Sequence, residues 1–175
     1  AGVEFVVLDR PNPLGGRRVE GPMVTDAYRS FVSRWNIPYA YGMTCGELAR
    51  MINGERWITN RCQLTVIAMS NWKRSMTWKD TGLPFVATSP NVKTPEAALY
   101  LVATGVLGEL GGVSLGLGTS APFQCVAAPW LNGEKLAQQF ASYSLPGIRF
   151  SSAEFTPARG AYKDQLVKGV RIRFT

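Results

Sequence analysis

The feature that most constrains the fold is the apolar run that opens the chain and ends abruptly in a turn. Residues Phe5-Val6-Val7-Leu8 show no alternation of apolar and polar side chains, a pattern typical of a strand buried on both faces of a parallel sheet. The run is followed at once by Asp9-Arg10-Pro11-Asn12-Pro13-Leu14-Gly15-Gly16, a charged turn that prolines stiffen and glycines end. A buried strand needs neighbours, and little chain precedes it here. We therefore expect the neighbouring strands to lie in segments outside this chain.

The composition fits a globular chain with an anionic partner. Of the 175 residues, 46% are hydrophobic and 18% are charged, which suffices for one ordinary core, or for a small domain with a fragment of another. Basic residues outnumber acidic ones by 19 to 12, giving a net charge of +7, and this favours carboxylate ligands, acidic polymers or nucleic acid. No nucleic-acid motif accompanies the charge, and Arg171 and Arg173 alternate with apolar residues as on the solvent face of a strand. We predict no nucleic-acid partner, and no span of roughly 20 apolar residues indicates a membrane helix.

The residue types present argue against several kinds of catalytic centre. The chain has no histidine, and its three cysteines, Cys45, Cys62 and Cys125, are widely spaced. This argues against a zinc site, a Ser-His-Asp triad and a histidine general base. We expect free, buried thiols and no zinc site.

Short strands alternating with short helices predict an α/β or α+β fold. The clearest local signal is Thr44-Cys45-Gly46-Glu47, a capping box that begins a helix ending near Gly54. Thr94 and Pro95 predict the start of a second helix, which we expect to stop before Gly105, because glycines between 105 and 118 deny a regular helix. The remaining expected elements are a short helix from Asp26 through Val32, a helix over 134–142, and strands over 37–41, 63–69, 148–155 and 167–174.

The first candidate site follows the opening strand, because ligands of open α/β sheets bind beyond the carboxyl ends of strands. Arg10 is suited to an anionic group through a bidentate fork, and Asn12 to a hydroxyl or amide. Asp9 is a candidate catalytic acid. The alternative is a buried Asp9-Arg10 pair followed by a useful turn, and the sequence favours neither reading.

A second polar loop carries Ser89, Asn91 and Thr94, for which the alternative is a simple helix cap. Tyr41 can offer a flat face to a sugar ring, with core packing as its alternative. Glu109 is a second candidate acid, but no spacing identifies the carboxylate pair of a glycosidase.

Motifs in a fixed order carry a family resemblance across nearly the whole chain. They are Leu8-Asp9-Arg10-Pro11-Asn12-Pro13-Leu14-Gly15-Gly16, Val19-Glu20-Gly21-Pro22, Gly42-Met43-Thr44, Gly46-Glu47-Leu48-Ala49, Thr81-Gly82-Leu83-Pro84, Ser89-Pro90-Asn91, Gly118-Thr119, Pro122-Phe123 and Ala128-Pro129-Trp130-Leu131. In these segments the chain resembles the exo-β-N-acetylmuramidase (NamZ-like) family, bacterial enzymes of peptidoglycan turnover. The Gly118-Thr119 motif adds Thr119 to the candidate substrate-binding residues.

The resemblance implies a Rossmann-like N-terminal domain and a C-terminal α/β domain that enclose a cleft. It implies release of N-acetylmuramic acid from the non-reducing end of peptidoglycan fragments, without metal or nucleotide. On this reading residues 1–35 are the end of the Rossmann-like domain and residues 36–175 the C-terminal domain. The family's work on peptidoglycan fragments favours a periplasmic or secreted site, with a cytoplasmic one still open.

Two departures from the family pattern bear on activity. The family's preceding segments, which the resemblance implies hold the catalytic acid, have no counterpart here. Many relatives also read Glu-Gly-Arg-Gly-Thr where this chain reads Leu115-Gly116-Leu117-Gly118-Thr119. We expect the chain to supply substrate-binding walls and to work with the missing N-terminal half or a companion chain. The alternatives are a non-catalytic binding or structural subunit of a larger assembly, and a piece of a longer polypeptide.

Overall fold

The computed structural model describes residues 2–175 and divides into two compact units, one up to Pro84 and one from Phe85 onward. Helices and strands are mixed in both units, which confirms the predicted α/β class. No helix within the described residues is both long and apolar enough to cross a bilayer.

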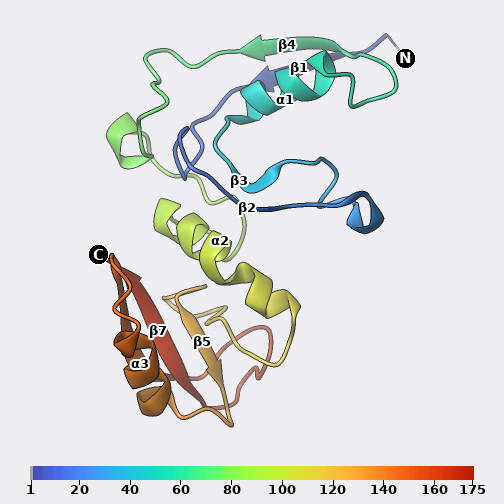
Figure 1. Ribbon diagram of the computed structural model, residues 1–175. Helices are drawn as coiled ribbons and strands as arrows, with labels where there is room; N and C mark the ends of the chain where they lie inside the picture. Colours follow the sequence, from blue (N-terminus) through green and yellow to red (C-terminus); the bar gives the residue numbers. More distant parts are fainter. Residues whose placement is uncertain (1) are drawn as a thin grey trace. The chain divides into compact units, whose positions relative to one another are not determined.

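The first unit contains two small sheets. Strand β1 (Glu4–Leu8) pairs in parallel with β4 (Gln63–Ile67), and helix α1 (Cys45–Gly54) packs against both (Figure 1). Strand β2 (Val19–Met23) forms an antiparallel pair with β3 (Pro38–Tyr41). Two 3-10 turns, η1 (Asp26–Tyr28) and η2 (Lys79–Thr81), lie in the connections.

The expectation that the opening strand is buried on both faces is wrong. Phe5, Val6 and Leu8 are 59%, 50% and 65% exposed. Within residues 2–175 β1 has one hydrogen-bonded neighbour, β4, and α1 is the helix packed on the pair, so these elements cannot cover both faces of the strand. The apolar run predicted the strand correctly and its surroundings incorrectly.

Helix α1 begins as the capping box predicts. The Thr44 hydroxyl accepts a hydrogen bond from the Glu47 N–H at 3.2 Å, and the Glu47 carboxylate accepts one from the Thr44 N–H at 3.0 Å. The two bonds satisfy donors that a helix start otherwise leaves unpaired. The segment after Asp26 is shorter than expected, a single 3-10 turn without a side-chain cap.

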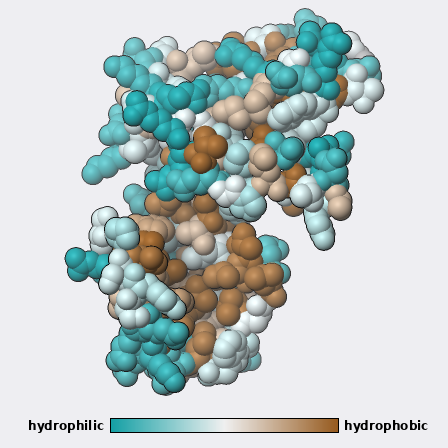
Figure 2. All heavy atoms as spheres, in the orientation of Figure 1, coloured by the Kyte–Doolittle hydropathy of each residue, from teal (hydrophilic) through white to brown (hydrophobic). Residues whose placement is uncertain are grey.

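The second unit is built on an antiparallel sheet of order β5-β7-β6. The strands are β5 (Cys125–Ala128), β6 (Ile148–Phe155) and β7 (Val167–Phe174), and helix α3 (Gly133–Ser142) packs on β6 and β7 (Figure 1). Helix α2 (Pro95–Glu109) contributes to the core formed by Val92, Ala97, Tyr100, Leu115 and Phe123. Hydrophobic residues also gather on the face of this unit that the space-filling view presents (Figure 2).

Helix α2 starts at Pro95 after the Thr94 cap, as predicted, but it runs through Gly105 to Glu109. The expected stop before Gly105 is therefore wrong. Glycine at position 108 has a packing role in this helix. A Cβ there would lie 2.9 Å from Cδ1 of Leu115. The missing side chain lets the core residue Leu115 approach the helix, and this packing outweighs the low helix propensity of glycine.

The division between the units does not fall at residue 35, where the family resemblance led us to expect a domain boundary. Strands β2 and β3 pair across that position, with Val19 opposite Tyr41 and Glu20 opposite Ala40. Residues 36–84 therefore belong to the same compact unit as residues before them.

The sheet of the second unit depends on a close approach that only glycine permits. A Cβ at Gly169, in the central strand β7, would lie 2.1 Å from the carbonyl oxygen of Val126 in β5. A Cβ at Gly133, at the start of α3, would lie 2.4 Å from the carbonyl oxygen of Gly169. Helix and sheet therefore meet backbone to backbone at Gly169.

We expect Gly169→Ala to destabilise the second unit by about 2 kcal/mol or more, because an overpacked core forces backbone shifts. Gly54→Ala is the matched control, since nothing lies within 4 Å of a Cβ there, and alanine in a helix should be neutral or slightly stabilising. Urea unfolding of both variants measures the difference. Equal midpoints for the two variants would contradict the close-packing account.

Candidate functional site

The cavities of the two units differ in how many predicted site residues they contain. A cavity of about 550 Å³ in the second unit brings together three of them, Asn91, Thr94 and Thr119. We call it the cationic pocket. Its lining residues are Pro90, Asn91, Lys93, Thr94, Ala97, Gly118, Thr119, Ser120, Pro122, Gln124, Ala158 and Arg159.

The first wall of the cationic pocket is the loop before α2. Val92, which is buried in the core, anchors it, and the Val92 N–H donates to the Ser89 hydroxyl at 3.2 Å. The Thr94 hydroxyl accepts from the Ala97 N–H at 3.2 Å. Thr94 is thus the helix cap that the alternative reading described, and it also lines the pocket. Ser89 shapes the loop and lies outside the lining.

The second wall is the turn around Thr119. Its hydroxyl donates to the Gly116 carbonyl at 2.7 Å and accepts from the Ala121 N–H at 3.1 Å, so the side chain holds the turn together. Gly118 has a φ of +79°, and a Cβ there would lie 2.9 Å from Cβ of Ala158. Glycine therefore allows the third wall, Ala158 and Arg159, to close against the second.

Phe123 fixes the floor of the cationic pocket between Pro122 and Gln124. Its φ is +64°, a backbone conformation unfavourable for a bulky residue. Three groups hold it there: the side chain is buried in the core, the N–H donates to the Leu115 carbonyl at 2.7 Å, and the carbonyl accepts from the Thr104 hydroxyl at 2.8 Å. Thr104 is itself only 1% exposed.

The charge of the cationic pocket has a single sign. Lys93 and Arg159 are its charged lining residues, and neither forms an ion pair within residues 2–175. No carboxylate lines the pocket. Two uncompensated cations beside neutral hydrogen-bonding groups suit an anionic ligand with polar substituents.

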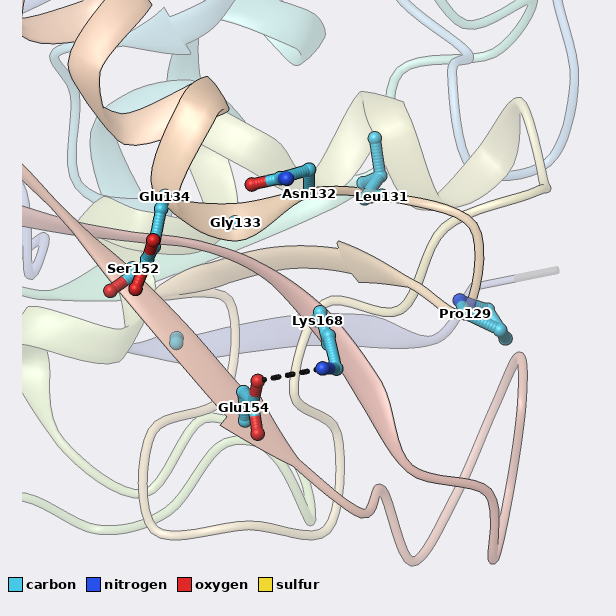
Figure 3. Close-up of a pocket in the computed structure, with 9 residues that line it drawn as sticks. Pro129, Leu131, Asn132, Gly133, Glu134, Ser152, Glu154 and Lys168 are labelled. Atoms are coloured by element: carbon cyan, nitrogen blue, oxygen red, sulfur yellow. Dashed lines mark ion pairs between the residues drawn. The ribbon is translucent and has the colours of Figure 1, made fainter.

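A second cavity of the same unit, of about 720 Å³, is acidic rather than cationic. Glu134 at the start of α3, Glu154 on β6 and Lys168 on β7 line it, with Ser152 beside them (Figure 3). Lys168 lies 3.1 Å from Glu154 and neutralises it. None of the predicted site residues is in this cavity.

In the first unit, the candidate acid Asp9 joins β1 to α1. It is 7% exposed, and its Oδ2 accepts from the Thr44 hydroxyl at 2.7 Å. Its Oδ1 accepts from the N–H groups of Gly46 at 2.8 Å and Arg10 at 3.0 Å. Both carboxylate oxygens are occupied by these donors, an arrangement that stabilises the helix start rather than presenting a proton to a ligand.

The other predicted residues of the first unit are dispersed. Arg10 is exposed, and Nη1 reaches only the neighbouring Asp9 carbonyl, at 3.4 Å. Asn12 donates to the Met43 carbonyl and accepts from the Leu14 N–H, both at 2.9 Å, so it holds the turn. Tyr41 is half-buried, and burial raises the pKa of its phenol, with a smaller contribution from Cys45.

The second candidate acid and the cysteines contribute no site. Glu109 is exposed at the last residue of α2 and lines neither cavity of its unit. Burial raises the pKa of the Cys125 thiol, and nearby Arg171 opposes this in part. Residues 2–175 contain no group of three or more metal-ligating His, Cys, Asp or Glu side chains.

Sequence reasoning missed Lys93, Ser120, Gln124 and Arg159, which complete the cationic pocket. Lys93 lies within the predicted polar loop, so its position was a usable signal. Arg159 is far from both motifs in sequence and comes to the pocket only through the close contact of Gly118 with Ala158.

Comparison with known proteins matches both parts of the chain to one family. Residues 1–96 match the family model described as "Exo-beta-N-acetylmuramidase NamZ, N-terminal", and residues 99–175 match "Exo-beta-N-acetylmuramidase NamZ, C-terminal". Residue 35 therefore falls inside the match to the N-terminal model.

Individual relatives agree with the family match. The chain is 43% identical, over 174 residues, to the peptidoglycan beta-N-acetylmuramidase NamZ of Bacillus subtilis, covering 99% of this chain and 41% of that protein. A crystal structure of a DUF1343 family protein from Bacteroides fragilis is 45% identical with a TM-score of 0.92, covering 98% of this chain and 44% of that one. A second DUF1343 structure from the same organism is 33% identical with a TM-score of 0.75, over 96% and 43%. The chain thus spans less than half the length of these relatives.

We expect Asp9→Ala to destabilise the first unit by about 3 kcal/mol, because it leaves buried donors of Thr44 and Gly46 unpaired. Asp9→Asn keeps the shape and one acceptor oxygen, so it should lower the free energy of unfolding by less than half as much. Chemical unfolding of both variants measures this. An unfolding midpoint of Asp9→Ala equal to that of the parent chain would contradict the structural role.

Proposed function

Because this chain belongs to the NamZ exo-β-N-acetylmuramidase family, we propose that it forms part of a glycoside hydrolase that releases N-acetylmuramic acid from the non-reducing end of peptidoglycan fragments. Its own share of the work is to bind the sugar. The remaining part of the active site comes from the additional length that its relatives possess.

The observation that carries this proposal is the charge of the cationic pocket. N-acetylmuramic acid differs from N-acetylglucosamine by a lactyl ether that ends in a carboxylate. Lys93 and Arg159 offer that carboxylate two cations that no acidic side chain neutralises within residues 2–175. Charge-assisted hydrogen bonds of this kind are stronger than neutral ones, so the pocket is suited to the group that distinguishes this sugar.

The neutral residues of the pocket suit the rest of the sugar. Asn91 carries an amide with both donor and acceptor groups, and the residues around it present hydroxyls and a backbone turn. Arg10, Asn12 and Tyr41 lie in the first unit and are not assigned to this pocket. Ser89 acts through the loop that presents Asn91.

A catalytic acid is a separate requirement. The cationic pocket has no carboxylate, both oxygens of Asp9 accept hydrogen bonds at the start of α1, and Glu109 lines neither the cationic pocket nor the acidic cavity. Because hydrolysis of a glycoside by this route needs a carboxylic acid beside the scissile bond, we assign the acid to the part of the enzyme that this chain does not include.

A non-catalytic binding subunit is the second candidate function. The same absence of a carboxylate from the lining of the cationic pocket favours it, together with Leu117 at the position where the family resemblance implies an arginine. Both functions require the same sugar-binding pocket, and they differ in whether a catalytic half completes it.

We expect the chain to bind N-acetylmuramic acid more tightly than N-acetylglucosamine, and Lys93→Ala/Arg159→Ala to abolish this preference. Loss of two charge-assisted bonds should weaken N-acetylmuramic acid binding about 100-fold, at about 1.5 kcal/mol each, and leave N-acetylglucosamine nearly unchanged. Lys135→Ala/Arg149→Ala, which removes the same charge outside the pocket, is the matched control. Calorimetric titration measures both sugars. A similar loss of N-acetylmuramic acid affinity in the control variant would show that the effect comes from the net charge of the chain and not from the pocket.

We also expect the 175-residue chain alone to leave a chromogenic N-acetylmuramic acid glycoside uncleaved, because it lacks the catalytic acid. Co-expression with a polypeptide corresponding to the rest of a full-length relative should restore release of the chromophore. Turnover by the isolated chain would show that the acid lies within it. Sugar binding without turnover in the reconstituted pair would favour the non-catalytic function.

A further inference from the structure

We propose that the side-chain NH₂ of Gln124 donates a hydrogen bond to the N-acetyl carbonyl of the bound sugar. Arg171 is the positioning residue that sets the orientation of the Gln124 amide. This inference rests on the proposed function, because it places a second contact in the same pocket. It adds to the cationic contacts a means of distinguishing N-acetylated sugars from other carboxylate-bearing sugars.

The orientation of the Gln124 amide follows from its partner. Nη2 of Arg171 lies 2.8 Å from Oε1 of Gln124. A guanidinium carries only donors, so the atom that faces it must be the amide oxygen. The NH₂ group of Gln124 then has no protein partner among the residues described, and Gln124 lines the cationic pocket. In the proposed arrangement, this NH₂ group is the neutral donor that Gln124 offers to the pocket.

The side chain of Arg171 is partly buried and contacts Gln124 instead of extending into solvent. The sequence pattern predicted a solvent-facing strand residue, but Arg171 is half-buried, and its Nε is buried without a hydrogen-bond partner. It forms no ion pair within residues 2–175. Among the residues described, the Arg171 side chain forms one hydrogen bond, the bond to Gln124, and a buried donor left unpaired costs free energy. The bond to Gln124 is thus the contact that orients this partly buried guanidinium and the amide opposite it.

The backbone reinforces the same placement. The Gln124 carbonyl accepts from the Ile172 N–H at 2.8 Å, and Cys125 is paired with Arg171 between β5 and β7. Gln124 also follows the left-handed Phe123 directly. Both the main chain and the side chain of Gln124 are therefore fixed before a ligand binds, which lowers the entropic cost of recognition.

The ligand group opposite Gln124 should be a neutral acceptor. Lys93 and Arg159 already supply charged donors for a carboxylate, whereas a neutral amide N–H matches a neutral carbonyl. The acetamido group of N-acetylmuramic acid contains such a carbonyl. This group is attached to the ring carbon next to the one that bears the lactyl ether. One sugar can therefore engage the cationic and the neutral donors of the pocket together.

Two ligand pairs separate this inference from the proposed function. N-acetylmuramic acid and 3-O-lactyl glucose both carry the carboxylate and differ in the acetamido group, so their affinity ratio reports N-acetyl recognition. N-acetylmuramic acid and N-acetylglucosamine differ in the lactyl group, so their ratio reports carboxylate recognition. Titrations of the 175-residue chain by calorimetry or NMR give both ratios.

In Gln124→Leu and Arg171→Met we expect the N-acetyl ratio to fall by about 2- to 13-fold, the range for one neutral hydrogen bond. The carboxylate ratio should change less than twofold. Arg171→Lys, which keeps a donor near Oε1, should recover part of the N-acetyl ratio, which a merely structural role for Arg171 would not produce. Thermal unfolding of each variant confirms that it is folded, and Gln124→Leu decides alone if Arg171→Met unfolds.

An N-acetyl ratio unchanged in folded Gln124→Leu would overturn the inference and leave the proposed function intact. Equal falls in both ratios would also overturn it, because they would indicate general damage to the pocket. A parent chain that binds N-acetylmuramic acid and N-acetylglucosamine equally would instead overturn the proposed function, while the N-acetyl ratio would still test Gln124.

Discussion

The second unit depends on the backbone of Phe123, which is held in a left-handed conformation that phenylalanine adopts only at a cost. The core buries its ring, and Leu115 and Thr104 hold its N–H and carbonyl. Because Pro122 and Gln124 flank it, this one conformation directs the chain along the floor of the pocket and then into β5. The candidate site is therefore attached to the buried core of its unit, which restricts the movement of the binding loops.

Local signals in the sequence predicted structure well wherever neighbouring residues decide it. The capping box at Thr44 and Glu47 and the Thr94-Pro95 helix start involve residues within three positions of each other, and both formed as expected. The strands over 148–155 and 167–174 pair with each other over their full length, and in the second of them Arg171 and Arg173 alternate with apolar residues. Where partners are distant, prediction failed. Helix α2 continues past Gly105 because Leu115 packs against Gly108, and β1 is exposed because its surroundings, not its own residues, determine burial.

The candidate site shows the same difference between features decided by neighbouring residues and features decided by distant ones. Asn91, Thr94 and Thr119 are predicted from loops and motifs and meet in one pocket. Arg159 joins them through a tertiary contact, whereas Gln124 directly follows the Pro122-Phe123 motif and was missed although it is close in sequence. In the first unit, Asp9 is a predicted candidate acid and Asn12 a predicted ligand-binding group, yet their hydrogen bonds hold α1 and the turn after β1. Polar residues in a proline-stiffened turn fit either role, and sequence alone could not tell which atoms the backbone would occupy.

The central claim is that a sugar carboxylate binds between the loop before α2 and the turn around Thr119. Backbone amide chemical shifts of the 175-residue chain, followed by NMR during titration with N-acetylmuramic acid, test it most directly. We expect saturable shifts at residues 91–94, 118–120, 124 and 159. Shifts confined to the acidic cavity around Glu134, Glu154 and Lys168, or to the first unit, would contradict it.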